Sequence, residues 1–290
     1  MKKENKRNYF LIFILVLFSF ILVYFFIFLK LPSYIKNQES VSQDKNSINH
    51  SDLGISIGTN IFNLSQDDLE KQFSDMSESG FKWIRFDFDW SLIQPSSPNS
   101  FTYSSLDRVV DVAYKYKINI LGIIDNTPAW AREDGCYNLH CPPKNMSDFS
   151  VFVDFLVARY SQKNVHVWEI WNEPNLVTFW GQKPNVEKYT EVLSTAYKTI
   201  KTKDNNSIVL TGGIGVADVS KGDIKPLDFI EALYKNGAKD YFDAIGFHPY
   251  TYPLLPSSDT YQNSWLQISY LDESILNIMK NNSDESKQIW

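Results

Sequence analysis

The feature that most constrains the fold is an alternation of short apolar segments with longer amphipathic ones, which begins near Leu53 and continues along the chain. The short segments have strand length and are rich in β-branched and aromatic residues, and the longer ones have helical spacing. This alternation is typical of βα units whose strands form a parallel sheet. The predicted strands span 53–57, 83–88, 118–124, 165–171, 208–211 and 242–247, and the predicted helices span 65–79, 104–115, 146–160, 186–202, 227–235 and 264–281.

The number of units predicts a barrel that lacks its last part. Six units are complete, and a seventh strand begins at about Gln288, close to Trp290. A (β/α)8 TIM barrel has eight strands, so about six and a half βα units are present. We therefore expect residues 53–290 to be a C-terminally truncated α/β barrel domain with exposed strand edges, low stability and a tendency to aggregate. A naturally short protein is the alternative.

The segment before the barrel predicts a membrane anchor. Residues 9–29 are almost entirely apolar, and roughly twenty such residues span a bilayer. The basic segment 1–8 precedes them, which predicts a cytoplasmic N-terminus and one transmembrane helix. The apolar run stays bulky up to Lys30 without a small-residue cleavage site, which favours an uncleaved anchor over secretion after signal cleavage. Residues 30–52 are polar and predict a flexible linker to an extracellular domain.

Composition narrows the choice of partner. The net charge is −6, and no basic stripe is visible, which argues against nucleic-acid binding. Aromatic residues make up 15% of the chain, with 8 Trp and 16 Tyr. This content suits a sugar-binding cleft, although cores also use aromatic residues.

The chain has two cysteines, Cys136 and Cys141, in one short loop. A disulfide between them is plausible outside the cytoplasm, and it would constrain the loop more than it stabilises the domain. A metal site that includes His140 is disfavoured, because three ligands so close in sequence rarely complete a site, so we expect no metal.

The strongest functional signal is the stretch from Trp168 to Asn175, which reads Trp-Glu-Ile-Trp-Asn-Glu-Pro-Asn. Its first part is a buried strand by composition, and the strand ends at the turn-forming Asn172-Glu173-Pro174-Asn175. A carboxyl group walled by apolar side chains, here expected to be Trp168 and Trp171, keeps its proton to a higher pH than an exposed one. Such a group can act as a general acid, so Glu173 is a candidate catalytic residue. The alternative is a carboxylate that only caps the next turn.

This strand resembles the acid/base strand of retaining glycoside hydrolases of clan A, which are (β/α)8 barrels. The similarity is greatest to family 39, which includes β-xylosidases and exopolysaccharide glycosidases, and next to the cellulase-like family 5. Other strand ends resemble the same clan in the expected order, and they read Gly54-Ile55-Ser56, Trp83-Ile84-Arg85-Phe86-Asp87, Thr127-Pro128-Ala129-Trp130 and Phe247-His248-Pro249-Tyr250.

The resemblance implies roles for individual residues. Glu173 corresponds to the proton donor at the end of the fourth strand, and Asn172 to the residue that contacts the sugar 2-hydroxyl. Arg85 corresponds to an arginine that supports the nucleophile, although strand alternation also allows a structural pair with Glu169. His248 and Tyr250 correspond to residues beside the nucleophile and the sugar.

Aromatic and acidic residues near other strand ends are further candidates. Trp130 is a candidate sugar platform, and Trp90 and Trp180 are weaker ones. Three aspartates could contact sugar hydroxyls or cap helices, and the sequence does not choose among them: Asp87, Asp89 and Asp125.

The resemblance implies a membrane-anchored extracellular glycoside hydrolase that cleaves a polysaccharide or oligosaccharide with retention. Its nucleophile is expected just beyond Trp290, because Lys287-Gln288-Ile289-Trp290 resembles the start of the clan's seventh-strand phrase. The truncated chain is therefore expected to be inactive by itself. A carbohydrate-binding pseudoenzyme or inactive fragment is the alternative. No cofactor is implied, and we expect a monomer.

Overall fold

The structure is a computed structural model, and it describes residues 53–250 and 265–290. The predicted basic segment 1–8, anchor 9–29 and linker 30–52 lie outside the described residues. Among the helices that are described, none is both long and apolar enough to cross a membrane.

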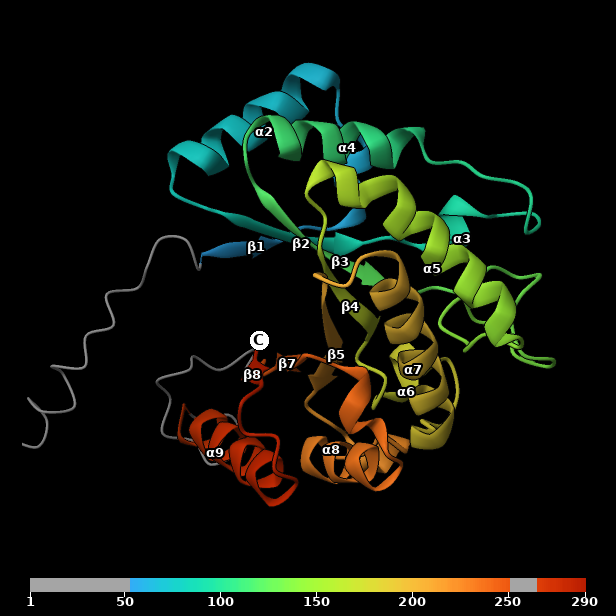
Figure 1. The fold of residues 1–290 in the computed structure, drawn as a ribbon, viewed down its shortest axis with the longest axis vertical. Coiled ribbons are helices and arrows are strands. Elements are labelled where there is room, and N and C mark those ends of the chain that lie inside the picture. The colour runs from blue at the N-terminus through green and yellow to red at the C-terminus, as the bar shows by residue number, and fades with distance from the viewer. Residues whose placement is uncertain (1–52, 251–264) are drawn as a thin grey trace, which may run out of the picture. The chain divides into compact units, whose positions relative to one another are not determined.

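A curved parallel sheet forms the centre of the domain (Figure 1). Its main path runs in the order β1-β2-β3-β4-β5-β6-β8, and β7 pairs with β5 beside that path. All of these pairings are parallel, so the carboxyl ends of the strands meet at one edge. The strands are β1 (Gly54–Ser56), β2 (Trp83–Asp87), β3 (Asn119–Ile124), β4 (Val167–Asn172), β5 (Ile208–Gly215), β6 (Ala244–Ile245), β7 (Phe247–His248) and β8 (Gln288–Ile289).

Helices cover the outer face of the sheet (Figure 1). The starts of α2 and α7 have side-chain caps, since Ser65 Oγ accepts from Asp68 N at 3.1 Å and Asn185 Oδ1 accepts from Lys188 N at 2.9 Å. The helices are α2 (Gln66–Glu78), α3 (Trp90–Ile93), α4 (Ser104–Lys115), α5 (Met146–Tyr160), α6 (Val177–Trp180), α7 (Val186–Lys203), α8 (Pro226–Lys235) and α9 (Trp265–Asn281), with short 3-10 turns η2 (Thr59–Asn63), η3 (Ser161–Lys163), η4 (Val219–Lys221) and η5 (Ala238–Tyr241).

β4 is buried along nearly its whole length, because helices cover its outer face and its inward residues pack against those of neighbouring strands. The outward residues of β4 join the large core between sheet and helices, where Trp168 packs edge-on against Phe88 at 5.1 Å. The inward residues form a smaller cluster inside the curve of the sheet, composed of Val167, Leu210 and Ala244. The polar inward residues therefore lie beyond this apolar layer, toward the carboxyl ends of the strands.

The predicted sixth strand, 242–247, is interrupted in the structure. β6 pairs with β5 and β8, whereas β7 pairs with β5 alone. Gly246 lies between them, and its N–H donates to Thr211 Oγ1 at 3.0 Å instead of to a strand carbonyl. This diversion turns the chain so that His248 continues β7 at the carboxyl edge.

The sheet is an incomplete barrel over the described residues, as the sequence predicted. No strand pairing there joins β1 to β8. A cavity of about 920 Å³ lies between these two strands. The ring of Trp290 reaches across it to Trp83, with centroids 5.6 Å apart in an edge-to-face contact. The fold is thus a parallel (β/α)8-type sheet that is open on the side of β1 and β8.

Candidate active site

A cavity of about 460 Å³ lies at the carboxyl edge of the sheet. Its walls come from β1, β2, β3 and β4 and from the segments that follow β1, β4 and β7. In (β/α)8 barrels this edge is where catalytic residues collect. The lining residues are Ser56, Ile57, Gly58, Arg85, Phe86, Asp87, Ile123, Asn172, Glu173, Phe179 and Tyr250.

Glu173 follows β4 directly and lines this cavity. Its backbone has a φ of 46°, and Trp171 two residues earlier has a φ of 74°. Left-handed conformations are costly for non-glycine residues and often occur at functional sites. They turn the chain at the strand end, and Glu173 is left only 6% exposed. Its Oε1 lies 2.9 Å from Nδ1 of His248.

Arg85 and Glu169 form a buried ion pair beneath Glu173. Arg85 donates from Nε to Glu169 Oε2 at 2.7 Å and from Nη2 to Glu169 Oε1 at 2.8 Å. Burial lowers the pKa of Arg85, but hydrogen bonds and charge from Glu169 outweigh it and raise that pKa overall. The structural pair considered in the sequence analysis therefore exists.

The same guanidinium also orients Asn172. Arg85 Nη2 donates to Asn172 Oδ1 at 2.9 Å. With its carbonyl oxygen engaged, Asn172 has its amide N–H groups left to donate at the cavity that it lines. This geometry suits a contact with a sugar hydroxyl, although that role stays a prediction.

His248 reaches Glu173 across β5. β7 pairs with β5 so that Gly215 lies opposite His248. The imidazole leans over Gly213, where an added Cβ would lie 2.0 Å from His248 Nε2. Only a residue without a side chain fits at Gly213. Tyr250 follows, 62% exposed, with its ring centroid 5.3 Å from that of His248.

Three aspartates form an acidic cluster beside the cavity, composed of Asp87, Asp89 and Asp125. Burial raises the pKa of Asp87 to about 6, against the opposing charge of Arg85 and with help from Asp89. Burial also raises the pKa of Asp89, which caps α3. Burial, and then the charge of Asp87, raise the pKa of Asp125 well above its ordinary value. Of the three, Asp87 lines the cavity.

The tryptophans lie elsewhere than the sequence suggested. Trp130 donates from Nε1 to the carbonyl of Gln94 at 2.8 Å and packs edge-on against Trp90. Trp171 packs against Trp180 at 5.4 Å in the helix-facing core. None of them is among the described residues that line the cavity. The structure thus brings together Arg85, Asn172, Glu173, His248 and Tyr250, and leaves Trp130 apart.

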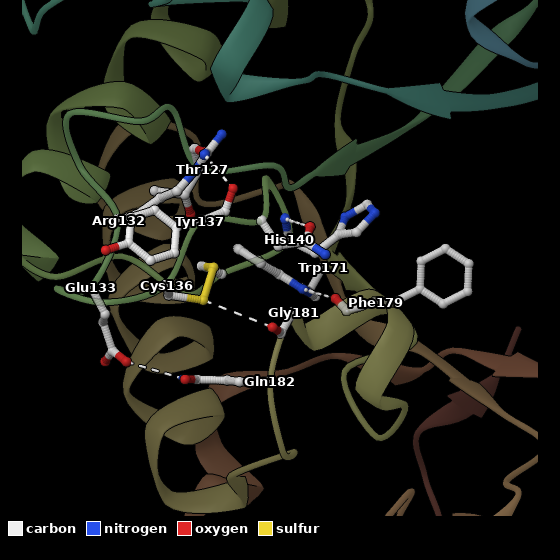
Figure 2. Close-up of a disulfide and its surroundings, with 12 residues drawn as sticks. Thr127, Arg132, Glu133, Cys136, Tyr137, His140, Trp171, Phe179, Gly181 and Gln182 are labelled. Atoms are coloured by element: carbon white, nitrogen blue, oxygen red, sulfur yellow. Dashed lines mark hydrogen bonds between the residues drawn. A yellow bond between two sulfur atoms is a disulfide. The ribbon is translucent and has the colours of Figure 1, made fainter. Parts of the chain in front are cut away.

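Sequence reasoning missed Phe179, which supplies the aromatic wall next to Glu173. The adjacent Trp180 was considered, but one turn of α6 points Trp180 into the core and Phe179 toward the cavity. A loop with a disulfide between Cys136 and Cys141 packs beside α6 (Figure 2). The sequence shows two adjacent aromatic residues after β4, Phe179 and Trp180. It does not indicate which of the two rings faces the cavity.

Comparisons with known proteins agree with this fold. The profile of the cellulase family, glycosyl hydrolase family 5, matches residues 41–284. Similar solved structures include a family 39 glycoside hydrolase from Bacteroides cellulosilyticus WH2, at 23% identity and a TM-score of 0.55, covering 70% of this chain and 39% of that one. The family 39 enzyme from Xanthomonas axonopodis pv. citri has 20% identity and a TM-score of 0.59, with coverage of 78% and 48%. No curated protein matches the chain.

A monomeric β-xylosidase from Caulobacter crescentus CB15 is also similar, at 23% identity and a TM-score of 0.54, with coverage of 69% of this chain and 42% of that one. This chain thus spans less than half the length of these three solved structures. The predicted resemblance to clan A is confirmed by the family 5 profile and the shared fold of the family 39 structures. The chain belongs to the cellulase family of glycoside hydrolases, glycosyl hydrolase family 5.

Proposed function

We propose that this domain hydrolyses O-glycosidic bonds of a polysaccharide or oligosaccharide, with Glu173 as general acid and base. The observation that carries the proposal is the position of Glu173 in the 460 Å³ cavity, with His248 Nδ1 2.9 Å from its Oε1. A protonated Glu173 donates to the glycosidic oxygen as the bond breaks. The resulting carboxylate then takes a proton from the attacking water.

Retention of configuration requires a second carboxylate about 5–5.5 Å from the first. Glu169 is a poor candidate, because Arg85 occupies both of its oxygens and Gly213 N donates to Oε1 at 2.8 Å. These three hydrogen bonds occupy the oxygens that would have to attack the sugar.

The register of β8 supports a nucleophile supplied by residues after Trp290. Trp290 N donates to Ile245 O, and Phe247 N donates to Trp290 O, both at 2.8 Å. A residue that continued this strand would therefore come level with His248 at the carboxyl edge. The coding sequence after codon 290 tests this part: a Glu within about five residues agrees with a retaining enzyme, whereas Gln or Ala there agrees with a carbohydrate-binding protein without hydrolysis.

The decisive variant is Glu173→Gln in a protein that includes the residues after Trp290. We expect turnover of substrates with poor leaving groups to fall by about two to four orders of magnitude. Activated aryl glycosides need little protonation and should lose less in the glycosylation step. The matched control is Glu191→Gln, which alters an exposed carboxylate of α7. Unchanged turnover of a natural oligosaccharide by Glu173→Gln would contradict the proposal.

The domain is proposed to act outside the cytoplasm, tethered by residues 9–29. The basic segment before this apolar run and the disulfide between Cys136 and Cys141 support the location. Fractionation of cells should find the protein in the membrane fraction, with the domain open to added protease on intact cells. Recovery of a soluble form that lacks the apolar run would favour signal cleavage instead.

A further inference from the structure

Phe179 is the aromatic side chain that α6 contributes to the cavity. It is half-buried and shares the cavity wall with Glu173 and Asn172. A flat aromatic face beside the groups expected to act on a sugar offers a stacking surface for the apolar face of the ring. The helix that carries it has only the four residues Val177–Trp180, too few to be stable by itself. Its position must be fixed by neighbours.

Two of those neighbours hold α6 from the core. Trp171 donates from Nε1 to the carbonyl of Phe179 at 2.7 Å, and the fully buried Trp180 packs against Trp171. These contacts fix how closely α6 packs against the core. They do not involve the residues after Trp180, so other contacts must hold the C-terminal end of the helix.

The disulfide loop supplies the contacts at that end (Figure 2). Gly181 has a φ of 71° and lies so close to the loop that an added Cβ would be 2.8 Å from Cys141 N. Gln182 donates to Glu133 Oε2 at 3.1 Å across the same junction. The loop backbone at Cys141 is thus pressed directly against the helix terminus.

His140 carries the contact through to Phe179. Its ring lies edge-on to that of Phe179, with centroids 5.5 Å apart and an interplanar angle of 63°. Burial lowers the pKa of His140, so the ring is neutral at pH 7 and packs as an aromatic group. Figure 2 shows this ring next to Phe179.

Hydrogen bonds within the loop support its shape, since Cys141 N donates to Asn138 O at 3.1 Å and His140 N donates to Asn138 Oδ1 at 2.9 Å, but its outer part is open to solvent. Tyr137, at its tip, is 90% exposed, and the neighbouring residues 134 and 135 are exposed as well. The cross-link between Cys136 and Cys141 closes the loop and fixes the backbone of His140 and Cys141.

We propose that Phe179 is a sugar-contacting residue of the site and that the Cys136–Cys141 disulfide holds it in place through His140 and Gly181, so that carbohydrate binding weakens when the disulfide is reduced. The sugar contact rests on the proposed function. Reduction by a small dithiol converts the S–S bond into two thiols and oxidises the dithiol to its own disulfide. His140, Cys136 and Cys141 are positioning residues and do not touch the sugar.

Binding of xylotriose and cellotriose to the full chain, measured by calorimetry, tests the proposal. We expect Phe179→Ala to weaken binding by about five- to tenfold, since it removes one aromatic contact. Dithiol treatment and the double variant Cys136→Ser/Cys141→Ser should weaken it by about threefold or more, because Phe179 remains but is less well placed. His140→Ala should resemble the reduced protein, and His140→Phe should restore binding. In a catalytically active form these changes should raise KM more than they lower kcat.

The Trp171 indole N–H resonance reports the coupling without any sugar, since that N–H donates to Phe179. It should shift on reduction, whereas the indole of Trp83, on β2, should not. Tyr137→Ala is the matched loop control and should change neither binding nor the resonance.

The outcomes separate the two ideas. If the oxidised chain binds sugar and neither Phe179→Ala nor reduction weakens binding, the proposal is wrong. An unmoved Trp171 resonance on reduction would overturn the role of the disulfide. If the oxidised chain binds neither sugar, the sugar contact fails together with the proposed function, while the resonance still decides whether the loop holds α6.

Discussion

Two groups of acidic residues lie near each other at the carboxyl edge of the sheet, Glu169 and the cluster of Asp87, Asp89 and Asp125. Among these described acids, only Glu169 is hydrogen-bonded to an arginine. Glu169 is 1% exposed and receives two hydrogen bonds from Arg85 and one from Gly213. Asp125 is 4% exposed, and its Oδ1 has no hydrogen-bond partner among the described residues. The charged groups that most affect Asp125 are two further acids, Asp87 and Asp89.

The difference shows that the partner, more than burial itself, decides whether an interior carboxyl is ionised. Desolvation disfavours the charged form of a buried carboxyl. At Glu169 the guanidinium of Arg85 supplies the hydrogen bonds and the opposite charge that replace the lost hydration. At Asp87 burial outweighs the attraction of Arg85, and at Asp125 burial and the charges of Asp87 and Asp89 act together, so the pKa of each of these carboxyls is raised. One region is therefore a fixed ion pair, and the other is a group whose charge depends on pH.

The largest expected effect on stability comes from breaking the ion pair between Arg85 and Glu169. Arg85→Met leaves the charge of Glu169 buried without a counter-ion, and we expect the free energy of unfolding to fall by about 3–5 kcal/mol. Arg85→Met/Glu169→Leu removes both charges and should recover most of that loss. Urea denaturation measures both. Lys163→Met breaks the exposed pair with Asp111 and serves as the control, which should leave the stability unchanged within error. If the double variant is as unstable as the single one, the comparison drawn above fails.

A smaller change in stability, of opposite sign, is expected from a substitution in the acidic cluster at Asp87. The pKa of Asp87 is about 6 in the fold against an ordinary value of 3.8, so the folded protein binds this proton more tightly than the unfolded chain. The contribution of Asp87 to the free energy of unfolding should therefore be largest below pH 4 and be lost as the pH rises through 6. Asp87→Asn removes this loss and should stabilise the domain at pH 7 by about 1–2 kcal/mol, after a discount for partial exposure and coupling.

The measurement is urea denaturation of both proteins at several pH values between 4 and 7. Asp240→Asn, a change at an exposed acid on η5, is the control and should leave the pH dependence as in the parent. A parent and an Asp87→Asn variant with parallel stability curves over this range would show that Asp87 does not differ from an ordinary surface acid.

Local pattern was enough to predict most of the fold. The predicted bounds of α4 and α5 match the structure to the residue, because amphipathic spacing within one segment defines them. The split of the sixth strand was not predictable, since it depends on Gly246 meeting Thr211 Oγ1 of β5. A contact between two segments that are far apart in the sequence leaves no recognisable pattern in the sequence of either segment.

In the candidate site, too, some features could be predicted from the sequence and others depend on contacts between distant segments. Glu173, Asn172, Arg85, His248 and Tyr250 come from strand ends, and parallel topology brings such ends together, so their meeting could be predicted. The left-handed backbone at Trp171 and Glu173 could not, because nothing in a Trp or a Glu favours it. The place of Phe179 depends on a disulfide loop more than thirty residues earlier in the chain.

The bare backbone at Gly213 has a consequence for how this candidate site can be altered. With an added Cβ only 2.0 Å from His248 Nε2, even a methyl group there would compete with the imidazole for the same space. This position of β5 therefore offers no side chain to vary. Redesign of the candidate site has more freedom at residues that line the cavity, such as Ser56, Asp87 and Phe179, where a change of shape need not displace the histidine.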